Sequence, residues 1–286
     1  MIHVLINPLS NNKKGIKGKT QLDIYLAGKQ FKYYNVTELK NEKEFYKNLP
    51  EDDEIIIAGG DGTLNHFIND IGDRKIPQKV YMLFCGTGND FFNDVRDKGV
   101  QLPNGLVSMN EYLESLPTVT VNGMTRKFVN GIGFGIDGYC CEEGDKIRAN
   151  SFEPVDYSKI AVKGLLGGYK PRNAKITVDG VTKEYKRVWL APTMIGRFYG
   201  GNIMVAPSQD RLNKEHTVSS VVMFRLPKLI ALINFPKVIA GKHEKCKSFF
   251  DARTGHEVTV EFDVPCALQI DGETVLNVKS YSVSYH

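Results

Sequence analysis

The chain has 286 residues, 42% of them hydrophobic, which is enough for one large or two ordinary folded domains. Its formal net charge of +4 is well below that of a typical nucleic-acid-binding domain, and it permits contacts with phosphates or with an anionic membrane surface. The longest apolar stretch, residues 229–240, contains polar breaks and is too short to cross a bilayer, which takes about 20 residues.

The five cysteines form no CxxC pair and lie mostly in apolar segments, as expected for buried thiols in a reducing compartment. The apolar residues after Met1 indicate a strand at the start of the sequence and leave no room for a signal peptide. We therefore expect a cytoplasmic protein without a nucleic-acid partner, in peripheral contact with the inner membrane face if its substrate is a lipid. A homodimer is compatible with the sequence.

Strands and helices alternate over the first third of the chain. A buried strand is predicted at residues 4–6, further strands at residues 31–36, 55–57 and 80–84, and helices at residues 16–27 and 39–49. This alternation is typical of a mostly parallel sheet covered by helices, so we predict a Rossmann-like α/β domain over residues 1–120. Asn7, Gly59 and Gly86 begin loops at the carboxyl ends of three strands, where such sheets bind their ligands.

The sequence pattern changes near Pro117. Asn122-Gly123 and Asp179-Gly180 are typical hairpin turns. Strand-like runs occur at residues 118–121, 126–129, 175–178, 183–190, 218–224, 258–262, 267–270 and 275–283. We predict that residues 121–286 form an antiparallel β-sandwich domain with a few helical insertions, and that the active site lies in the cleft between the two domains.

The most informative motif is Gly59-Gly60-Asp61-Gly62-Thr63, which follows an apolar strand. Apolar residues at positions 64, 67, 68 and 71 indicate that a helix begins directly after it. Glycines let a bulky anion approach the backbone, and the start of a helix offers unpaired N–H groups to that anion. Because the Asp61 carboxylate would repel a bare phosphate, we expect a cation or a lysine between the two.

Two further loops follow apolar strands. The first is Cys85-Gly86-Thr87-Gly88-Asn89-Asp90-Phe91, in which Asn89 or Asp90 is predicted to cap the next helix. The second begins with Asn7-Pro8-Leu9-Ser10 and continues to Lys13 and Lys14. These lysines either neutralise a chain of phosphates or form a solvated basic loop.

Two segments imitate nucleotide-binding signatures without their context. Gly18-Lys19-Thr20 looks like the end of a P-loop, but the first glycine that a P-loop requires is absent, because Lys13 occupies its position. Residues 133–138 satisfy GxGxxG, yet they belong to the antiparallel half of the chain. We therefore interpret residues 133–138 as a tight turn at the rim of the second domain.

Asp271, followed by Gly272 and Glu273, ends a predicted strand near the end of the sequence. Asp-Gly is a common hairpin connection, which is one interpretation of this segment. In the other interpretation Asp271 is a general base, because phosphoryl transfer to a hydroxyl group needs a carboxylate that accepts the proton.

Taken together, residues 59–65 and 86–91 resemble the motifs of the diacylglycerol kinase catalytic family, which includes bacterial lipid kinases and sphingosine kinases. The resemblance extends over residues 4–273, although the first motif alone is also similar to NAD kinases and phosphofructokinases. It implies that ATP and Mg²⁺ bind between an α/β domain and a β-rich domain. The residues that it places at the nucleotide are Asn7, Ser10, Gly59, Gly60, Asp61, Gly62, Thr63, Gly86, Thr87, Asn89, Asp90 and Glu273.

The same resemblance implies that Asp271 is the catalytic base and that Asp61 and Asp90 act at the phosphates or bind the catalytic Mg²⁺. It also points to an acidic metal loop, which usually reads Asp-Gly-x-Leu-Asp and here reads Asp210-Arg211-Leu212-Asn213. An amide in place of a carboxylate lowers the affinity for a hard cation, so we do not expect a strong structural Mg²⁺ site at Asp210.

Two other positions depart from the family pattern. Asn11 stands where the first loop usually has a glycine. Asn93 stands where the second loop usually has an arginine, and Arg96 follows one helical turn later. The loss of this cation weakens the neutralisation of phosphate charge unless Arg96 replaces it.

We predict an ATP-dependent kinase that phosphorylates the hydroxyl group of a diacylglycerol-like lipid, with a role in phospholipid metabolism. Two alternatives stay open: a soluble-substrate kinase related to NAD kinases, and a nucleotide-binding protein without catalysis. Residues 224–242 combine apolar residues, Leu226, Leu229, Ile230, Ile233 and Val238, with lysines. They either lie on an anionic membrane surface or pack as a helix on their own domain.

Overall fold

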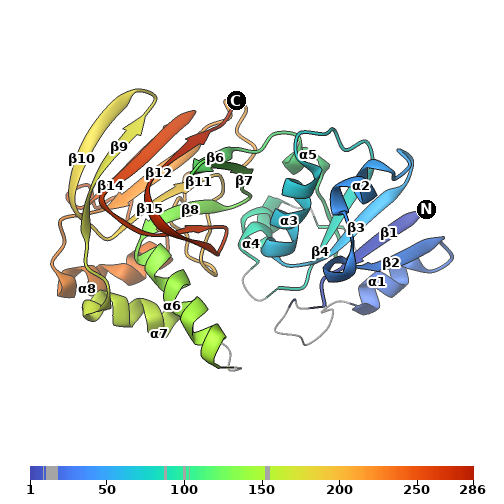
Figure 1. Cartoon of the computed structure of the whole chain (residues 1–286), viewed down its shortest axis with the longest axis horizontal. Coiled ribbons are helices and arrows are strands. Elements are labelled where there is room, and N and C mark those ends of the chain that lie inside the picture. Colours follow the sequence, from blue (N-terminus) through green and yellow to red (C-terminus); the bar gives the residue numbers. More distant parts are fainter. Residues whose placement is uncertain (9, 11–18, 87–88, 99–100, 103, 152–154) are drawn as a thin grey trace. The chain divides into compact units, whose positions relative to one another are not determined.

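The computed structural model describes residues 1–8, 10, 19–86, 89–98, 101–102, 104–151 and 155–286, and the chain divides into two units, Met1–Leu116 and Pro117–His286 (Figure 1). The predicted boundary after residue 120 falls inside β6 (Thr118–Val121), which pairs with β15 (Glu273–Ser284) of the second unit. The assignment of nucleotide binding to residues 1–120 and of substrate binding to residues 121–286 stays a prediction.

A five-stranded sheet with the order β2-β1-β3-β4-β5 forms the centre of the first unit. The parallel strands are β1 (Ile2–Ile6), β2 (Phe31–Asn35), β3 (Glu54–Gly59) and β4 (Lys79–Phe84), and short β5 (Val107–Ser108) runs antiparallel to β4. The α-helices are α1 (Lys19–Leu26), α2 (Glu42–Lys47), α3 (Asp61–Ile71), α4 (Asp90–Val95) and α5 (Asn110–Leu113). The 3-10 helices are η2 (Val36–Glu38) and η3 (Arg96–Lys98). The predicted mostly parallel α/β fold is confirmed, and the predicted start of the first helix, residues 16–18, lies outside the described residues.

Residues of both faces of this sheet are buried, as expected for parallel strands covered by helices. One core cluster packs Leu22 and Leu26 of α1 against Val4, Ile56 and neighbouring strand residues. The strand order reverses between β1 and β3, whose neighbours lead in opposite directions along the sheet. Ligands of open α/β sheets bind at such a reversal, beyond the carboxyl ends of the strands.

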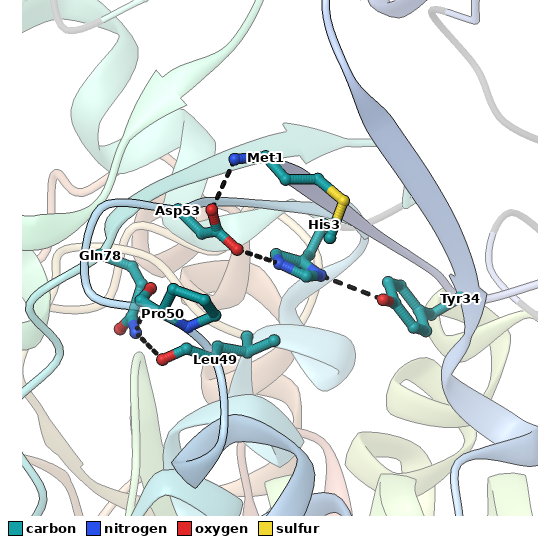
Figure 2. A network of polar contacts seen from close by, with 7 residues as sticks. All are labelled: Met1, His3, Tyr34, Leu49, Pro50, Asp53 and Gln78. Atoms are coloured by element: carbon teal, nitrogen blue, oxygen red, sulfur yellow. Dashed lines mark hydrogen bonds and ion pairs between the residues drawn. The ribbon is translucent and has the colours of Figure 1, made fainter.

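The amino ends of these strands are tied together by a polar network (Figure 2). His3 on β1 lies 2.7 Å from Asp53 and 3.1 Å from the hydroxyl of Tyr34 on β2. The amine of Met1 lies 2.5 Å from the other oxygen of Asp53. The Met1 amine and the His3 ring hold the pKa of the Asp53 carboxyl below its usual range. This network fixes the end of the sheet that lies opposite the predicted ligand loops.

The second unit contains a ten-stranded, antiparallel sheet within its described residues. Its strands are β6, β7 (Met124–Lys127), β8 (Gly131–Gly135), β9 (Arg172–Val178), β10 (Val181–Val188), β11 (Leu190–Met194), β12 (Val218–Met223), β13 (Phe250–Gly255), β14 (Glu257–Ile270) and β15. The runs predicted as two strands at residues 258–262 and 267–270 form one long strand, β14, with an irregularity around Pro265. The first half of β14 pairs with β9 and the second half with β8.

Four helical segments lie on one side of this sheet: α6 (Ile136–Asn150), α7 (Tyr157–Lys163), the π-helical turn η4 (Gly164–Gly168) and α8 (Lys228–Ile239) (Figure 1). Ala231 and Val238 of α8 and Leu165 of η4 pack in one core cluster with residues of the sheet such as Trp189 and Met223. None of the helices in the described part of the chain combines the length and apolar character that crossing a membrane requires.

The GxGxxG segment consists of the last three residues of β8 and the first three of α6, which follow each other directly at Gly135 (φ +108°), so our interpretation of residues 133–138 as a tight turn is corrected to a strand-to-helix junction. Each glycine makes room for a close neighbour. A Cβ on Gly138 would lie 1.9 Å from the carbonyl oxygen of Ala267, and one on Gly135 would lie 2.4 Å from the carbonyl oxygen of Trp189. The three glycines therefore seat α6 against the sheet, which explains the motif without a dinucleotide.

Gly133, the first glycine of the motif, leaves space for the buried carboxyl of Asp137 in the first turn of α6. The hydroxyl of Tyr199 donates a 2.8 Å hydrogen bond to Asp137 Oδ1. Burial raises the pKa of Asp137 to about 7, although the Tyr199 hydroxyl opposes the shift. The folded state therefore holds this carboxyl in its protonated form over a pH range in which the unfolded chain ionises it.

This difference predicts the pH dependence of stability for Asp137→Asn. Between pH 4 and pH 7 the unfolded state of the natural chain releases a proton that the folded state keeps, so stability falls as the pH rises. The asparagine variant does not titrate. Relative to the natural chain it should gain about 2–3 kcal/mol of unfolding free energy between pH 5 and pH 8. Denaturant unfolding at both pH values measures this gain, and parallel pH profiles of the two proteins would contradict it.

Candidate active site

The loops after β1 and β3 are joined by a side-chain hydrogen bond. Asn7 Nδ2 donates to Thr63 Oγ1 over 2.9 Å, and the backbone N–H of Asn7 donates to the carbonyl of Ala58. Ser10 follows in the same loop, and its N–H donates to the carbonyl of Asn7. Thr63 is buried, and a Cβ on Gly59 would lie 2.4 Å from the Thr63 hydroxyl oxygen. Glycine at position 59 is thus required by the packing of Thr63.

The two glycine-rich turns lie against each other. An ideal Cβ on Gly86 would lie 3.0 Å from the Cα of Gly60, and one on Gly60 would lie 3.3 Å from the Cα of Gly86. Any side chain at either position would push the turns apart. The structure therefore brings residues 59–63 and residue 86 together at the carboxyl ends of β3 and β4.

The Asp61 carboxylate links the same two turns. Asp61 Oδ2 accepts a 2.7 Å hydrogen bond from the N–H of Asp90 and a 3.5 Å hydrogen bond from the N–H of Phe91. It therefore caps the first turn of α4 from a neighbouring loop. The predicted cap was different: Asn89 is the cap residue of α4 in position, with a left-handed backbone, but its side chain makes no capping hydrogen bond.

Gly62 differs from the other glycines of the motif. It is exposed in the first turn of α3, its φ angle is not positive, and a Cβ there would meet no described atom within 4 Å. Packing among the described residues therefore gives no reason for glycine here. A close approach of a ligand to the start of α3 would give one.

Several predicted residues of these loops lie outside the described residues. They are Asn11, Lys13, Lys14, Thr87 and Gly88. Asp90 is described, and it is a buried residue in the first turn of α4. Arg96 Nη1 lies 3.3 Å from Asn93 Oδ1, so a guanidinium group is present beside the position at which the family usually has arginine.

In the second unit, three backbone N–H groups hold the carboxylate of Asp271. Asp271 Oδ2 accepts a 2.6 Å hydrogen bond from Val129, and Oδ1 accepts hydrogen bonds of 2.8 Å from Asn130 and 3.0 Å from Gly131. Three such donors stabilise the ionised form and fix its orientation. Asp271 is also the first residue of the turn between β14 and β15, with φ +47°. The hairpin interpretation is thus correct, and the same carboxylate is available as a candidate base.

Glu273, the second predicted carboxylate of this segment, forms an ion pair with Arg126 on β7, with 2.6 Å between Glu273 Oε2 and Arg126 Nη1. Both side chains are partly exposed. Arg126 was not predicted as a site residue, because a cation on a short hairpin strand has no local sequence pattern that marks its partner.

Arg211 was also missed as part of the candidate site. Its side chain is buried, and its guanidinium donates to the carbonyl of Val129 and, over 3.0 Å, to Asn130 Oδ1. These are two of the residues whose N–H groups hold Asp271. Arg211 therefore supports the backbone around the candidate base, and only its position in the acidic loop could have drawn attention to it.

The acidic loop is closed by the side chain of Asn213. Asn213 Nδ2 donates to the carbonyls of Asp210 (2.7 Å) and Thr217 (3.0 Å), and Asn213 Oδ1 accepts from the N–H and the hydroxyl of Thr217. Asp210 Oδ1 accepts from the N–H of Leu212 over 3.2 Å. The amide N–H₂ group of Asn213 thus donates hydrogen bonds to two carbonyl oxygens that could otherwise act as ligands of a hard cation. These residues therefore do not fit a structural Mg²⁺ at Asp210.

The predicted catalytic Mg²⁺ is a separate case. Within the described ranges, no three His, Cys, Asp or Glu side chains gather closely enough to hold a metal ion. Mg²⁺ in kinases binds one or two carboxylates together with the phosphates of the nucleotide, so a group of three is not required. The hydrogen bond described above joins the Asp61 carboxylate to the backbone of Asp90, and the role of the two carboxylates as Mg²⁺ ligands stays a prediction.

Comparisons with known proteins identify the family of each unit. Residues 1–121 match the family model of the diacylglycerol kinase catalytic domain, and residues 130–281 match that of the YegS C-terminal NAD kinase beta sandwich-like domain. The fold is also similar to a crystal structure described as "a putative diacylglycerol kinase from Bacillus anthracis", with a TM-score of 0.69 and 18% identity, over 100% of this chain and 92% of that one.

Sequence relatives are distant. "Putative lipid kinase YtlR" of Bacillus subtilis is 26% identical over 202 residues, which are 67% of this chain and 64% of that protein. A "Diacylglycerol kinase" of Mycobacterium tuberculosis is 22% identical over 198 residues, 67% of this chain and 61% of that protein. The matches thus span less than two thirds of the length of either relative.

The closure of the acidic loop predicts a gain of metal dependence for Asn213→Asp. The new carboxylate would face the carbonyls of Asp210 and Thr217 without a donor, so the variant should lose about 1–3 kcal/mol of stability in a chelator. Added Mg²⁺ or Ca²⁺ should restore part of this loss, because the loop then offers oxygen ligands only. Thermal unfolding without nucleotide measures both effects. Asn213→Ala is the control, which should be destabilised without recovery on addition of metal. If a chelator destabilised the natural chain, the closure of the loop by the Asn213 amide would be contradicted.

Proposed function

The chain belongs to the diacylglycerol kinase catalytic-domain family, and on this basis we propose that it is an ATP-dependent kinase that transfers the γ-phosphate to a hydroxyl group of a lipid. The observation that carries the proposal is the link from the Asp61 carboxylate to the start of α4, which joins the turns after β3 and β4 next to the reversal of strand order between β1 and β3. Such a position is where open α/β sheets bind nucleotides.

The turns supply the binding groups for ATP in this proposal. The N–H groups in the first turn of α3, at Asp61, Gly62 and Thr63, contact the phosphates, and the absence of a side chain at Gly62 lets them approach. Asn7, Ser10, Gly59, Gly60, Gly86, Thr87 and Asn89 line the nucleotide, and Arg96 supplies positive charge beside Asn93. Mg²⁺, bound by Asp61, Asp90 and the phosphates, would neutralise the charge of the triphosphate.

Asp271 acts as the general base. Its carboxylate orients the lipid hydroxyl and accepts the proton while the oxygen attacks the γ-phosphorus, and the bond to ADP breaks with its electron pair on the leaving oxygen. The amides of residues 129–131 keep the carboxylate in one orientation, and Arg211 supports them. In this proposal Glu273, which pairs with Arg126, would contact the nucleotide, as the family resemblance implies.

The acceptor is proposed to be a diacylglycerol-like lipid presented at a membrane surface, on the inner face in a cytoplasmic protein. Relatives that are named as lipid kinases support this class of acceptor over the soluble acceptor of NAD kinases. Catalysis is proposed over nucleotide binding alone because the relatives are named as kinases and the backbone amides of residues 129–131 hold the Asp271 carboxylate in one orientation.

A direct test is to incubate the protein with a total lipid extract and ATP labelled in its γ-phosphate, and to identify labelled products by mass. We expect a phosphorylated lipid. Label in a soluble product alone would favour the NAD-kinase-like alternative. Tight binding of ATP without any labelled product would favour a nucleotide-binding protein.

Gly62→Ala separates nucleotide binding from folding. The added Cβ meets open space and lies in a helix, where alanine is favoured over glycine by about 0.5–1 kcal/mol, so stability should be unchanged or slightly higher. If the phosphates approach the start of α3, the same Cβ should weaken ATP binding by about tenfold or more. Calorimetry measures the affinity and thermal unfolding the stability. An unchanged affinity would show that the nucleotide does not approach Gly62.

Asp271→Asn tests the general base, with Asp179→Asn as a matched control. Asp179 also precedes a glycine in a hairpin turn, has φ +46°, and accepts hydrogen bonds from the N–H groups of His256 and Glu257. Both variants should therefore lose similar stability. Turnover should fall by about 10²–10⁴ in Asp271→Asn only, with ATP binding retained. Equal activity of the two variants would mean that Asp271 is a turn residue and not a base.

A further inference from the structure

Both faces of helix α8 are apolar. Ala231, Asn234 and Val238 face inward and are buried, whereas Leu229 and Ile233 are each 67% exposed and Ile230 is 42% exposed. The interpretation of this segment as a helix packed on its own domain is confirmed for one face, and the membrane interpretation stays a prediction for the other. The helix packs on its own unit through one face, and Leu226 and Val238, which we had counted with the apolar residues of a membrane surface, belong to the core.

The exposed face of α8 continues onto neighbouring helical turns. Val162 at the end of α7 is 45% exposed and Leu166 in η4 is 58% exposed. The side chain of Lys228 at the start of α8 reaches Gly167 of η4, so the two segments adjoin. An open groove of about 620 Å³ follows the surface of α7 and η4 beside Val162 and Leu166. We call the set Val162, Leu166, Leu229, Ile230 and Ile233 the apolar face.

Positive charge surrounds the apolar face. Residues 224–242 contain Arg225, Lys228, Lys237 and Lys242 and no acidic residue. Lys159 and Lys163 add two cations on α7, although Lys159 lies 3.4 Å from Asp156 and Lys163 lies 3.7 Å from Glu143. The lysines of residues 224–242 are all exposed. The surface thus combines exposed aliphatic side chains with an excess of cations.

This combination fits an anionic bilayer. A helix that lies in a membrane interface exposes aliphatic side chains on one face and carries lysines at the edge of that face, where they meet the lipid headgroups. Contact sites for proteins are instead enriched in tryptophan, tyrosine and arginine, and the apolar face contains only leucine, isoleucine and valine. The described part of the chain has no membrane-spanning helix. A contiguous exposed apolar surface on such a protein indicates a binding surface.

We propose that the apolar face of α8, α7 and η4, with Lys228, Lys237 and Lys242 around it, docks the protein on an anionic membrane. Leu229, Ile233 and Leu166 enter the headgroup region, and the lysines pair with acidic lipids. The inference deepens the proposed function, because a lipid substrate is most accessible to a kinase that sits on the bilayer. Docking itself requires neither ATP nor turnover, so it can be tested separately.

The test is sedimentation of the full chain with phosphatidylcholine vesicles that contain or lack phosphatidylglycerol, without nucleotide. The natural chain should bind the anionic vesicles, and binding should weaken with salt and without phosphatidylglycerol. Leu229→Ser with Ile233→Ser should lower the partition coefficient at least tenfold. Lys228→Gln, Lys237→Gln and Lys242→Gln should each lower it about fivefold on anionic vesicles and leave binding to neutral vesicles unchanged.

The matched control is Val181→Ser with Leu276→Ser, which removes two aliphatic side chains of similar exposure, 62% and 59%, from β10 and β15. This control should bind vesicles like the natural chain. Equal binding of all variants, or absence of binding to anionic vesicles, would overturn the proposal. A change of oligomeric state in the Leu229 and Ile233 variant, without a change in vesicle binding, would identify the face as a protein interface and would also overturn it.

The lipid phosphorylation assay distinguishes a failure of the docking proposal from a failure of the proposed kinase function. Vesicle binding that depends on Leu229 and Ile233, in a protein without kinase activity, would support the docking surface and reject the kinase. Lipid phosphorylation without such binding would reject the docking surface and keep the kinase.

Discussion

The hydrogen bond from the N–H of Asp90 to the Asp61 carboxylate is the constraint on which the candidate nucleotide site depends. It joins the turn after β3 to the turn after β4, and the side chain of Asn7 joins the turn after β1 to the same place. The close approach of Gly60 and Gly86 is possible only because neither carries a Cβ. Described residues of three loops that are distant in the sequence are thus joined at the carboxyl ends of β1, β3 and β4.

The second unit uses the same chemistry. Here backbone N–H groups bind a carboxylate of the protein itself, Asp271, and a buried arginine holds the backbone that carries them. The acidic loop that positions Arg211 is closed by the amide of Asn213. An uncharged group therefore closes the loop at the place where the family pattern suggests a cation.

The glycine motifs of the two units contain glycine for different physical reasons. Gly133, Gly135 and Gly138 leave room for the protein's own atoms, namely the Asp137 carboxyl, the strand at Trp189 and the carbonyl of Ala267. Gly62 leaves open space at the start of a helix. Only the second situation suggests a ligand, and the distinction rests on what a Cβ would meet rather than on the motif.

The sequence by itself determined the alternation of strands and helices in the first unit, the antiparallel character of the second, and the turns at residues 59–63 and 86–90, because apolar periodicity and glycine turns are local properties. The tertiary structure decided the rest. It made Asp61, rather than Asn89, the cap of α4, it made the GxGxxG segment the junction of β8 and α6, and it exposed one face of α8. These outcomes depend on hydrogen-bond partners and packing neighbours that are far away in the chain, which no local pattern encodes.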